Sequence, residues 1–159
     1  MTARLGVVVG PGGMFAKLVA SAQRAPIIPL LDGGRQLLYV LGVERLTEIL
    51  RDMLARDGEG LRGRAWNLPQ PEPATLAEMM ATIVRVYGLR RVSLPLPARP
   101  LLWGAQLIEK QALVRLPVSS TNIRGLIQAG QKRFPSDYAR FGYPAQTLDE
   151  LVLAARRLM

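Results

Sequence analysis

Apolar residues near the start of the chain form one continuous run followed by a helical pattern. Residues 4–9 (RLGVVV) predict a strand buried on both faces, and residues 10–13 (GPGG) predict the turn that ends it. Apolar positions then recur with helical spacing over residues 14–24, and the prolines at positions 26 and 29 end that helix. A strand, a turn and a helix are therefore expected in this order.

Strand and helix patterns continue to alternate further along the chain. A tight turn is expected at residues 32–34 (DGG), a short strand over 37–41, and a helix over 43–56 with one apolar face. A brief strand is expected over 64–68. The prolines at positions 69, 71 and 73 then predict irregular chain up to the next helix.

Two capping boxes give the clearest helix starts. In Thr75-Leu76-Ala77-Glu78, the threonine hydroxyl and the glutamate carboxylate are expected to bind backbone amides that the first helical turn leaves unpaired. The helix that begins there is expected to end near Gly88. Thr147-Leu148-Asp149-Glu150 repeats the pattern and predicts a last helix.

The stretch between these two helices completes the predicted fold. A strand is expected over residues 91–94, ending at Pro95, followed by a helix over 99–113 and a helix that Ser119 or Ser120 caps and that reaches about residue 129. Strands separated by helices indicate the α/β class, with a few short strands covered by helices. We expect residues 1–159 to form a single domain.

The composition is that of a folded protein with a restricted set of chemistries. Apolar residues make up 49% of the 159 residues and charged residues 21%, which argues against disorder. The chain contains neither cysteine nor histidine. Disulfides, thiol nucleophiles, zinc sites built on these residues and Ser-His or Cys-His relays are therefore excluded.

The net charge of +9 raises nucleic acid or an anionic surface as a partner. The basic residues are scattered, however, and lysine occurs only at positions 17, 110 and 132. No basic run alternates with stacking aromatic residues, so nucleic-acid binding is not favoured. No apolar run approaches the roughly 20 residues that cross a bilayer. We therefore expect a cytoplasmic protein without a membrane partner.

Two local patterns have possible chemical roles. The turn at residues 10–13 lies between a strand and a helix, where backbone amides can hold a phosphate, but it matches neither G-x-G-x-x-G nor G-x-x-x-x-G-K-[ST]. A simple turn is the favoured interpretation. Glu44, Glu48 and Asp52 recur at i+4 spacing, as paired acids or metal ligands do. Because arginines stand beside them at positions 45, 51 and 56, a solvated charged face is favoured.

Several segments, in a fixed order, resemble the NAD-dependent epimerase/dehydratase family of extended and atypical short-chain dehydrogenase/reductases. Residues 4–13 look like that family's R-x-x-x-V-Y-G-P-G strand and turn, and residues 32–36 (DGGRQ) look like its G-[DG]-G-x-Q turn. Residues 66–78 (WNLPQPEPATLAE) are similar to Y-N-L-x-x-P-E-P-x-T-x-x-E, the most specific match. Residues 141–150 resemble the closing segment of the branch related to the complex I accessory subunit.

The resemblance implies the C-terminal, substrate-binding lobe of a Rossmann-type short-chain dehydrogenase/reductase. In complete members NAD(P) lies on the other half, and a Tyr-x-x-x-Lys pair handles the proton. None of the three lysines here has a tyrosine four residues before it. Residues 43–47 fall on the family's V-D-D-V-A segment, with Arg45 in place of an acid. The implied chain has no catalytic residue or metal, binds no cofactor alone and does not transfer hydride alone.

The family's lobe contacts a small-molecule substrate, often a nucleoside-diphosphate sugar. By resemblance, the contacts would come from Gly10, Pro11, Met14, Arg35 and Gln36. Two other functions stay open. One is a non-catalytic interaction or assembly module, as the branch related to the complex I accessory subunit suggests. The other is an anion or nucleic-acid binder, which salt-dependent binding would reveal.

The apolar strand expected over residues 4–9 also predicts that the chain associates with another chain. If its neighbours in the family's sheet are missing, its backbone groups and one apolar face lack cover. We therefore expect a homodimer or larger assembly, or a partner chain that supplies the cofactor half.

Overall fold

Two parallel strand pairs hold the N-terminal segment. The computed structural model describes residues 2–55, 63–97 and 135–159. Strand β1 (Thr2–Arg4) pairs in parallel with β6 (Ala65–Asn67), and β2 (Val7–Val9) pairs in parallel with β5 (Val40–Gly42). The prediction of one strand over residues 4–9 was therefore wrong, because the chain changes partner at Leu5 and Gly6.

A close backbone approach explains this interruption. A Cβ atom on Gly6 would lie only 1.8 Å from the carbonyl oxygen of Tyr39. The backbone amide of Val7 donates to that same oxygen at 2.6 Å. Only glycine leaves room for this crossing, so the run of apolar residues divides into two short strands.

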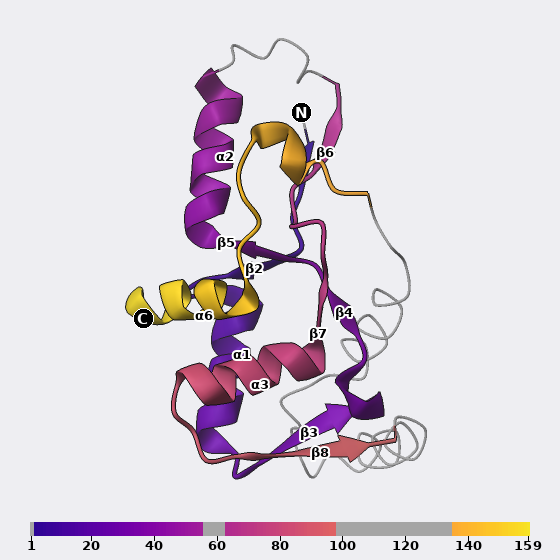
Figure 1. The fold of residues 1–159 in the computed structure, drawn as a ribbon, viewed down its shortest axis with the longest axis vertical. Coiled ribbons are helices and arrows are strands. Elements are labelled where there is room, and N and C mark those ends of the chain that lie inside the picture. Colours follow the sequence, from indigo (N-terminus) through magenta and orange to yellow (C-terminus); the bar gives the residue numbers. More distant parts are fainter. Residues whose placement is uncertain (1, 56–62, 98–134) are drawn as a thin grey trace, which may run out of the picture.

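The opposite end of the molecule contains a strand pair of which the sequence predicted one member. The strand expected over residues 91–94 is confirmed but continues through Pro95 to Leu96, and its partner over residues 27–31 was not predicted. Strand β3 (Ile27–Leu31) pairs in parallel with β8 (Val92–Leu96), and Figure 1 places this pair and β6 at opposite ends of the long axis. Pro29 and Pro95 lie inside these strands. A proline is tolerated where its missing amide would face an unpaired edge, and each strand of this pair has one such edge among the described residues.

A second correction concerns the proline-rich stretch before the capping box at Thr75. Strand β7 (Ala74–Thr75) pairs antiparallel with β4 (Leu37–Leu38), where irregular chain was expected. The pair is only two residues long, and the prolines at positions 69, 71 and 73 all precede it. The predicted strand over 37–41 is likewise divided into β4 and β5, which pair with different strands.

The predicted helices in the described ranges are confirmed. They are α1 (Gly13–Arg24), α2 (Val43–Ala55), α3 (Leu76–Val86) and α6 (Leu148–Arg157), with short 3-10 turns η1 (Asp32–Gly34) and η2 (Tyr138–Phe141). The predicted helices over 99–113 and 119–129 lie outside the described residues. None of the helices in the described ranges is long and apolar enough to cross a membrane. The mixed α/β class is confirmed.

Both capping boxes form as predicted. The Thr75 hydroxyl accepts from the Glu78 amide at 3.1 Å, and the Glu78 carboxylate accepts from the Thr75 amide at 2.7 Å. The corresponding distances between Thr147 and Glu150 are 3.3 and 2.7 Å. Each box satisfies amides that would otherwise lack an acceptor at the start of the helix.

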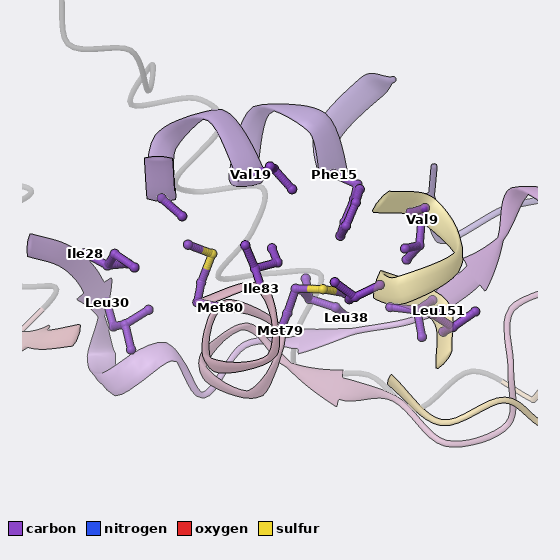
Figure 2. Close-up of a cluster of buried hydrophobic side chains, with 14 residues drawn as sticks. Val9, Phe15, Val19, Ile28, Leu30, Leu38, Met79, Met80, Ile83 and Leu151 are labelled. Carbon is purple, nitrogen blue, oxygen red and sulfur yellow. The ribbon is translucent and has the colours of Figure 1, made fainter. Parts of the chain in front are cut away.

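The larger hydrophobic cluster is organised around α3. Helix α3 packs against both α1 and α6, and its Met79 and Ile83 are completely buried. In Figure 2 the Met79 side chain lies beside Leu38 of β4, and Phe15 of α1 and Leu151 of α6 belong to the same cluster. Helical spacing on α3 thus places one apolar face where three other elements meet.

A smaller cluster lies beneath α2 and η2. Leu41, Ile49 and Leu68 are completely buried there, and the Trp66 and Phe141 rings meet edge to face at 5.8 Å between centroids. Figure 1 shows η2 beside β6 at the same end as α2. The C-terminal segment therefore returns to pack on strands from the first half of the chain.

The Gly6 crossing can be tested directly. Gly6→Ala should lower the free energy of unfolding by about 2 kcal/mol, because the added methyl group collides with backbone that cannot move aside. Gly12→Ala is the control: no atom lies within 4 Å of its added Cβ, so its only expected cost is the poorer N-cap that alanine gives α1, about 1 kcal/mol or less. Urea unfolding of both variants measures the difference, and equal losses would contradict the crossing.

The first capping box gives a second test. Thr75→Ala should lower the free energy of unfolding by about 1 kcal/mol, because the Glu78 amide loses its acceptor. Thr47→Ala makes the same change inside α2, where the hydroxyl only bonds back to the Val43 carbonyl, and it should cost nothing measurable. Thermal melts that do not separate the two variants would place the start of α3 elsewhere.

Candidate functional site

The turn between β2 and α1 contains three of the residues predicted to contact substrate. Gly10 is buried, and a Cβ there would lie 3.0 Å from the Cβ of Val43, so glycine lets the turn lie against the start of α2. Pro11 and Met14 are exposed, and Met14 keeps 47% of its surface accessible. No side chain caps the N-terminus of α1 at Gly12. The turn therefore presents Pro11 and Met14 outward beside the start of α1, where no side chain of the described residues caps the helix.

The second predicted contact segment follows η1, and its two residues differ in environment. Arg35 is exposed, whereas Gln36 is buried. The Gln36 side-chain amide donates to the Leu31 carbonyl at 2.9 Å, and its backbone carbonyl accepts from the Leu76 amide at 2.9 Å. Gln36 thus joins β3 to α3, and Arg35 is the residue of the pair that can reach a ligand.

The two predicted contact segments have different neighbours. The Gly10 turn lies against α2, and the Gln36 turn lies against β3 and α3. In Figure 1 the start of α1 lies beside β2, while η1 lies by β3 and β4, near the start of α3. The described contacts therefore do not bring the five predicted residues into one cluster.

Two of the acidic side chains on α2, Glu48 and Asp52, bind other side chains, whereas the sequence pattern favoured a solvated charged face. Glu48 forms an ion pair with Arg45 at 2.7 Å, and Asp52 accepts a hydrogen bond from the Tyr143 hydroxyl at 2.9 Å. The Arg45 guanidinium carbon lies 4.3 Å from the centre of the Tyr143 ring. The hydrogen bond to Asp52 raises the pKa of Tyr143. Within the described ranges, no group of three or more acidic side chains is placed to hold a metal.

A cavity of about 370 Å³ is lined by residues of β5, the loop before β7, α3, and the start of α6 with the loop before it. Its wall includes Gln70, Glu72 and Thr82, together with Gln146. Sequence reasoning did not select any of these residues. They come from separate segments. Gln70 and Glu72 lie inside the motif at residues 66–78, but that resemblance implied no role for either of them.

Glu78 also lines this cavity and is held as a carboxylate. Hydrogen bonds from the Thr75 backbone amide and hydroxyl lower its pKa below the ordinary value of 4.5. Its contribution to stability is therefore present above that ordinary value and is lost as the pH falls through the lowered pKa. At neutral pH the rim of the cavity carries a negative charge at this position.

Comparisons with known proteins identify the fold. No protein-family model and no curated protein matches the chain. Among solved structures, human epimerase family protein SDR39U1 (isoform 2, with NADPH) superimposes with a TM-score of 0.68 at 24% identity, over 98% of this chain and 48% of that one. This chain has the fold of about half of that epimerase-family protein.

A second structure agrees with that assignment. A variant of UDP-glucuronic acid 4-epimerase from Bacillus cereus, in complex with UDP-4-deoxy-4-fluoro-glucuronic acid and NAD, superimposes with a TM-score of 0.53 at 13% identity. The alignment covers 98% of this chain and 43% of the epimerase. The chain thus spans about half the length of these two structures, and the family resemblance drawn from its motifs is confirmed at the level of the fold.

Proposed function

We propose that this chain is the substrate-binding half of an NAD(P)-dependent epimerase or dehydratase, acting in the cytoplasm on nucleoside-diphosphate sugars. The observation that carries the proposal is the superposition of nearly the whole chain on about half of SDR39U1. The ordered motifs at residues 4–13, 32–36 and 66–78 support it independently. The UDP-sugar and NAD in the Bacillus cereus epimerase indicate the substrate class to test first.

Each proposed contact residue has a role that its environment supports. Arg35 is exposed, and its guanidinium would bind the diphosphate through charged hydrogen bonds. Gln36 is a positioning residue, because its side chain and backbone hold the turn against β3 and α3. Pro11 and Met14 would pack on apolar parts of the substrate, and Gly10 keeps their turn close to α2.

The residues of this chain do not fit a nicotinamide dinucleotide by themselves. Residues 58–63 spell G-x-G-x-x-G, but in the chain they follow α2 and precede β6, whereas a dinucleotide loop follows a strand and precedes a helix. In the turn after β2, Pro11 removes one of the backbone amides that would hold a phosphate. We therefore propose that a separate cofactor half supplies NAD(P) and the Tyr-x-x-x-Lys pair.

Substrate binding tests this function without requiring turnover. The chain should bind UDP-glucose or UDP-glucuronic acid in calorimetric titrations, and Arg35→Ala should weaken that binding about tenfold, since a charged hydrogen bond is lost. Arg90→Ala removes another exposed arginine and should change nothing. NAD or NADP should not bind in the low micromolar range.

Two results would contradict the proposal. Tight binding of NAD by the chain alone would refute the missing cofactor half. Absence of UDP-sugar binding would instead favour the non-catalytic assembly module.

We also propose that the chain associates with a second copy through β2. Among the described strands β2 has β5 as its neighbour, so one edge of β2 carries unpaired backbone groups. Val7 and Val9 pack into the larger cluster, whereas Val8 is half-buried and points to the other face of the strand. That face offers apolar surface to a partner.

Light scattering over a dilution series measures this association. A dimer is expected, and Val8→Lys should disperse it without unfolding the chain, because a lysine at the contact would have to be buried. Val92→Lys is the matched control, since Val92 lies in β8 and is 67% exposed. A monomer at high micromolar concentration, or dispersal by Val92→Lys alone, would refute pairing through β2.

A further inference from the structure

We propose that the cavity between α3 and α6 is a binding site for a small uncharged polyol, such as a single sugar. The cavity of about 370 Å³ lies at the small end of the usual range for ligand pockets, about 300–1,000 Å³. Val40, Leu148 and Leu151 form apolar parts of its wall. A sugar ring presents both C–H surface and hydroxyl groups, and this wall offers a partner to each.

Two buried polar side chains, Gln70 and Thr82, line this cavity, and each has a hydrogen-bonding group without a partner among the described residues. Gln70 is only 3% exposed, and its carbonyl oxygen accepts from the Gln146 amide at 2.6 Å. The Gln70 side-chain nitrogen makes no hydrogen bond to any described residue, although the residue lines the cavity. This nitrogen is not among the fully buried unpaired atoms of the described residues, so it is reached from the cavity. A ligand atom in the cavity would supply the missing acceptor.

Thr82 on α3 is a second lining residue with an unpaired polar group. It is 5% exposed, and its hydroxyl has no hydrogen-bond partner within the described ranges. The comparable hydroxyl of Thr47 on α2 bonds back to its own helix at 2.9 Å. Thr82 does not do so, which leaves its hydroxyl available to a bound molecule.

The charges around the cavity select the chemical class of the ligand. Glu72 and Glu78 contribute carboxylates, and no arginine or lysine is among the described lining residues. A phosphate is an anion that these carboxylates repel, and no cationic side chain among the described lining residues offsets that repulsion. An ammonium ion has no acceptor for the Gln70 amide. A hydroxyl group both donates and accepts, so an uncharged polyol satisfies all of these groups.

This site is distinct from the proposed substrate contacts. None of Gly10, Pro11, Met14, Arg35 and Gln36 lines the cavity. The inference therefore does not depend on the proposed function, and the two can fail separately.

Titration with D-glucose, followed by saturation-transfer NMR, tests the site in the full chain. Thr82→Val keeps the shape of the side chain and removes the hydroxyl, so it should weaken glucose binding about fivefold or more. Thr82→Ser keeps the hydroxyl and should bind like the original chain. Gln70→Glu keeps the acceptor for the Gln146 amide, removes the donor and should also weaken binding.

Control ligands separate this site from the alternatives. Inorganic phosphate and methylammonium should not bind at millimolar concentration, and Thr82→Val should leave UDP binding unchanged while Arg35→Ala leaves glucose binding unchanged. The proposal is overturned if glucose does not bind at millimolar concentration or if Thr82→Val binds it as well as Thr82→Ser does. Methylammonium binding that Glu72→Gln abolishes would overturn it in favour of a cation site.

Discussion

The packing of α3 against its neighbours is the constraint on which the rest of this structure depends. Met79 and Ile83 fill the space between α1, α6 and β4, and the start of α3 lies against η1 so closely that a Cβ on Gly34 would be 2.9 Å from Ala77. The Leu76 amide is held by the backbone of Gln36. One helix thereby fixes both the turn that presents Arg35 and one wall of the polyol cavity.

Some of the arginines that contribute to the positive charge of the chain form hydrogen bonds that join one element to another. The Arg91 side chain donates to the carbonyls of Ala22 and Gln23 at 3.0 and 2.8 Å, at the end of α1. Arg156 donates to the Val86 carbonyl at the end of α3 and lies 5.4 Å from the Tyr87 ring centre. Cations at helix C-termini satisfy free carbonyls and offset the helix dipole. Arg91 and Arg156 therefore have a structural role at the ends of α1 and α3.

The candidate sites differ in how far local sequence could reveal them. The turns at residues 10–13 and 35–36 are contiguous motifs, so resemblance could select them, but it did not separate exposed Arg35 from buried Gln36. The polyol cavity left no such signal. Gln70 and Thr82 come from different elements, and Gln146 reaches them from far along the chain. Polar residues of this kind can be recognised as a site only when folding gathers them around one cavity and leaves a donor there unpaired.

The sequence by itself determined the helices, their capped starts and the α/β class, because helical spacing and capping boxes act within a few residues. Tertiary structure alone decided how the strands divide and pair. The apolar run at residues 4–9 became two strands because the Tyr39 carbonyl crosses at Gly6, and prolines entered β3 and β8 because each strand keeps an unpaired edge. Strand pairing joins residues far apart in the chain, so no local pattern specifies it.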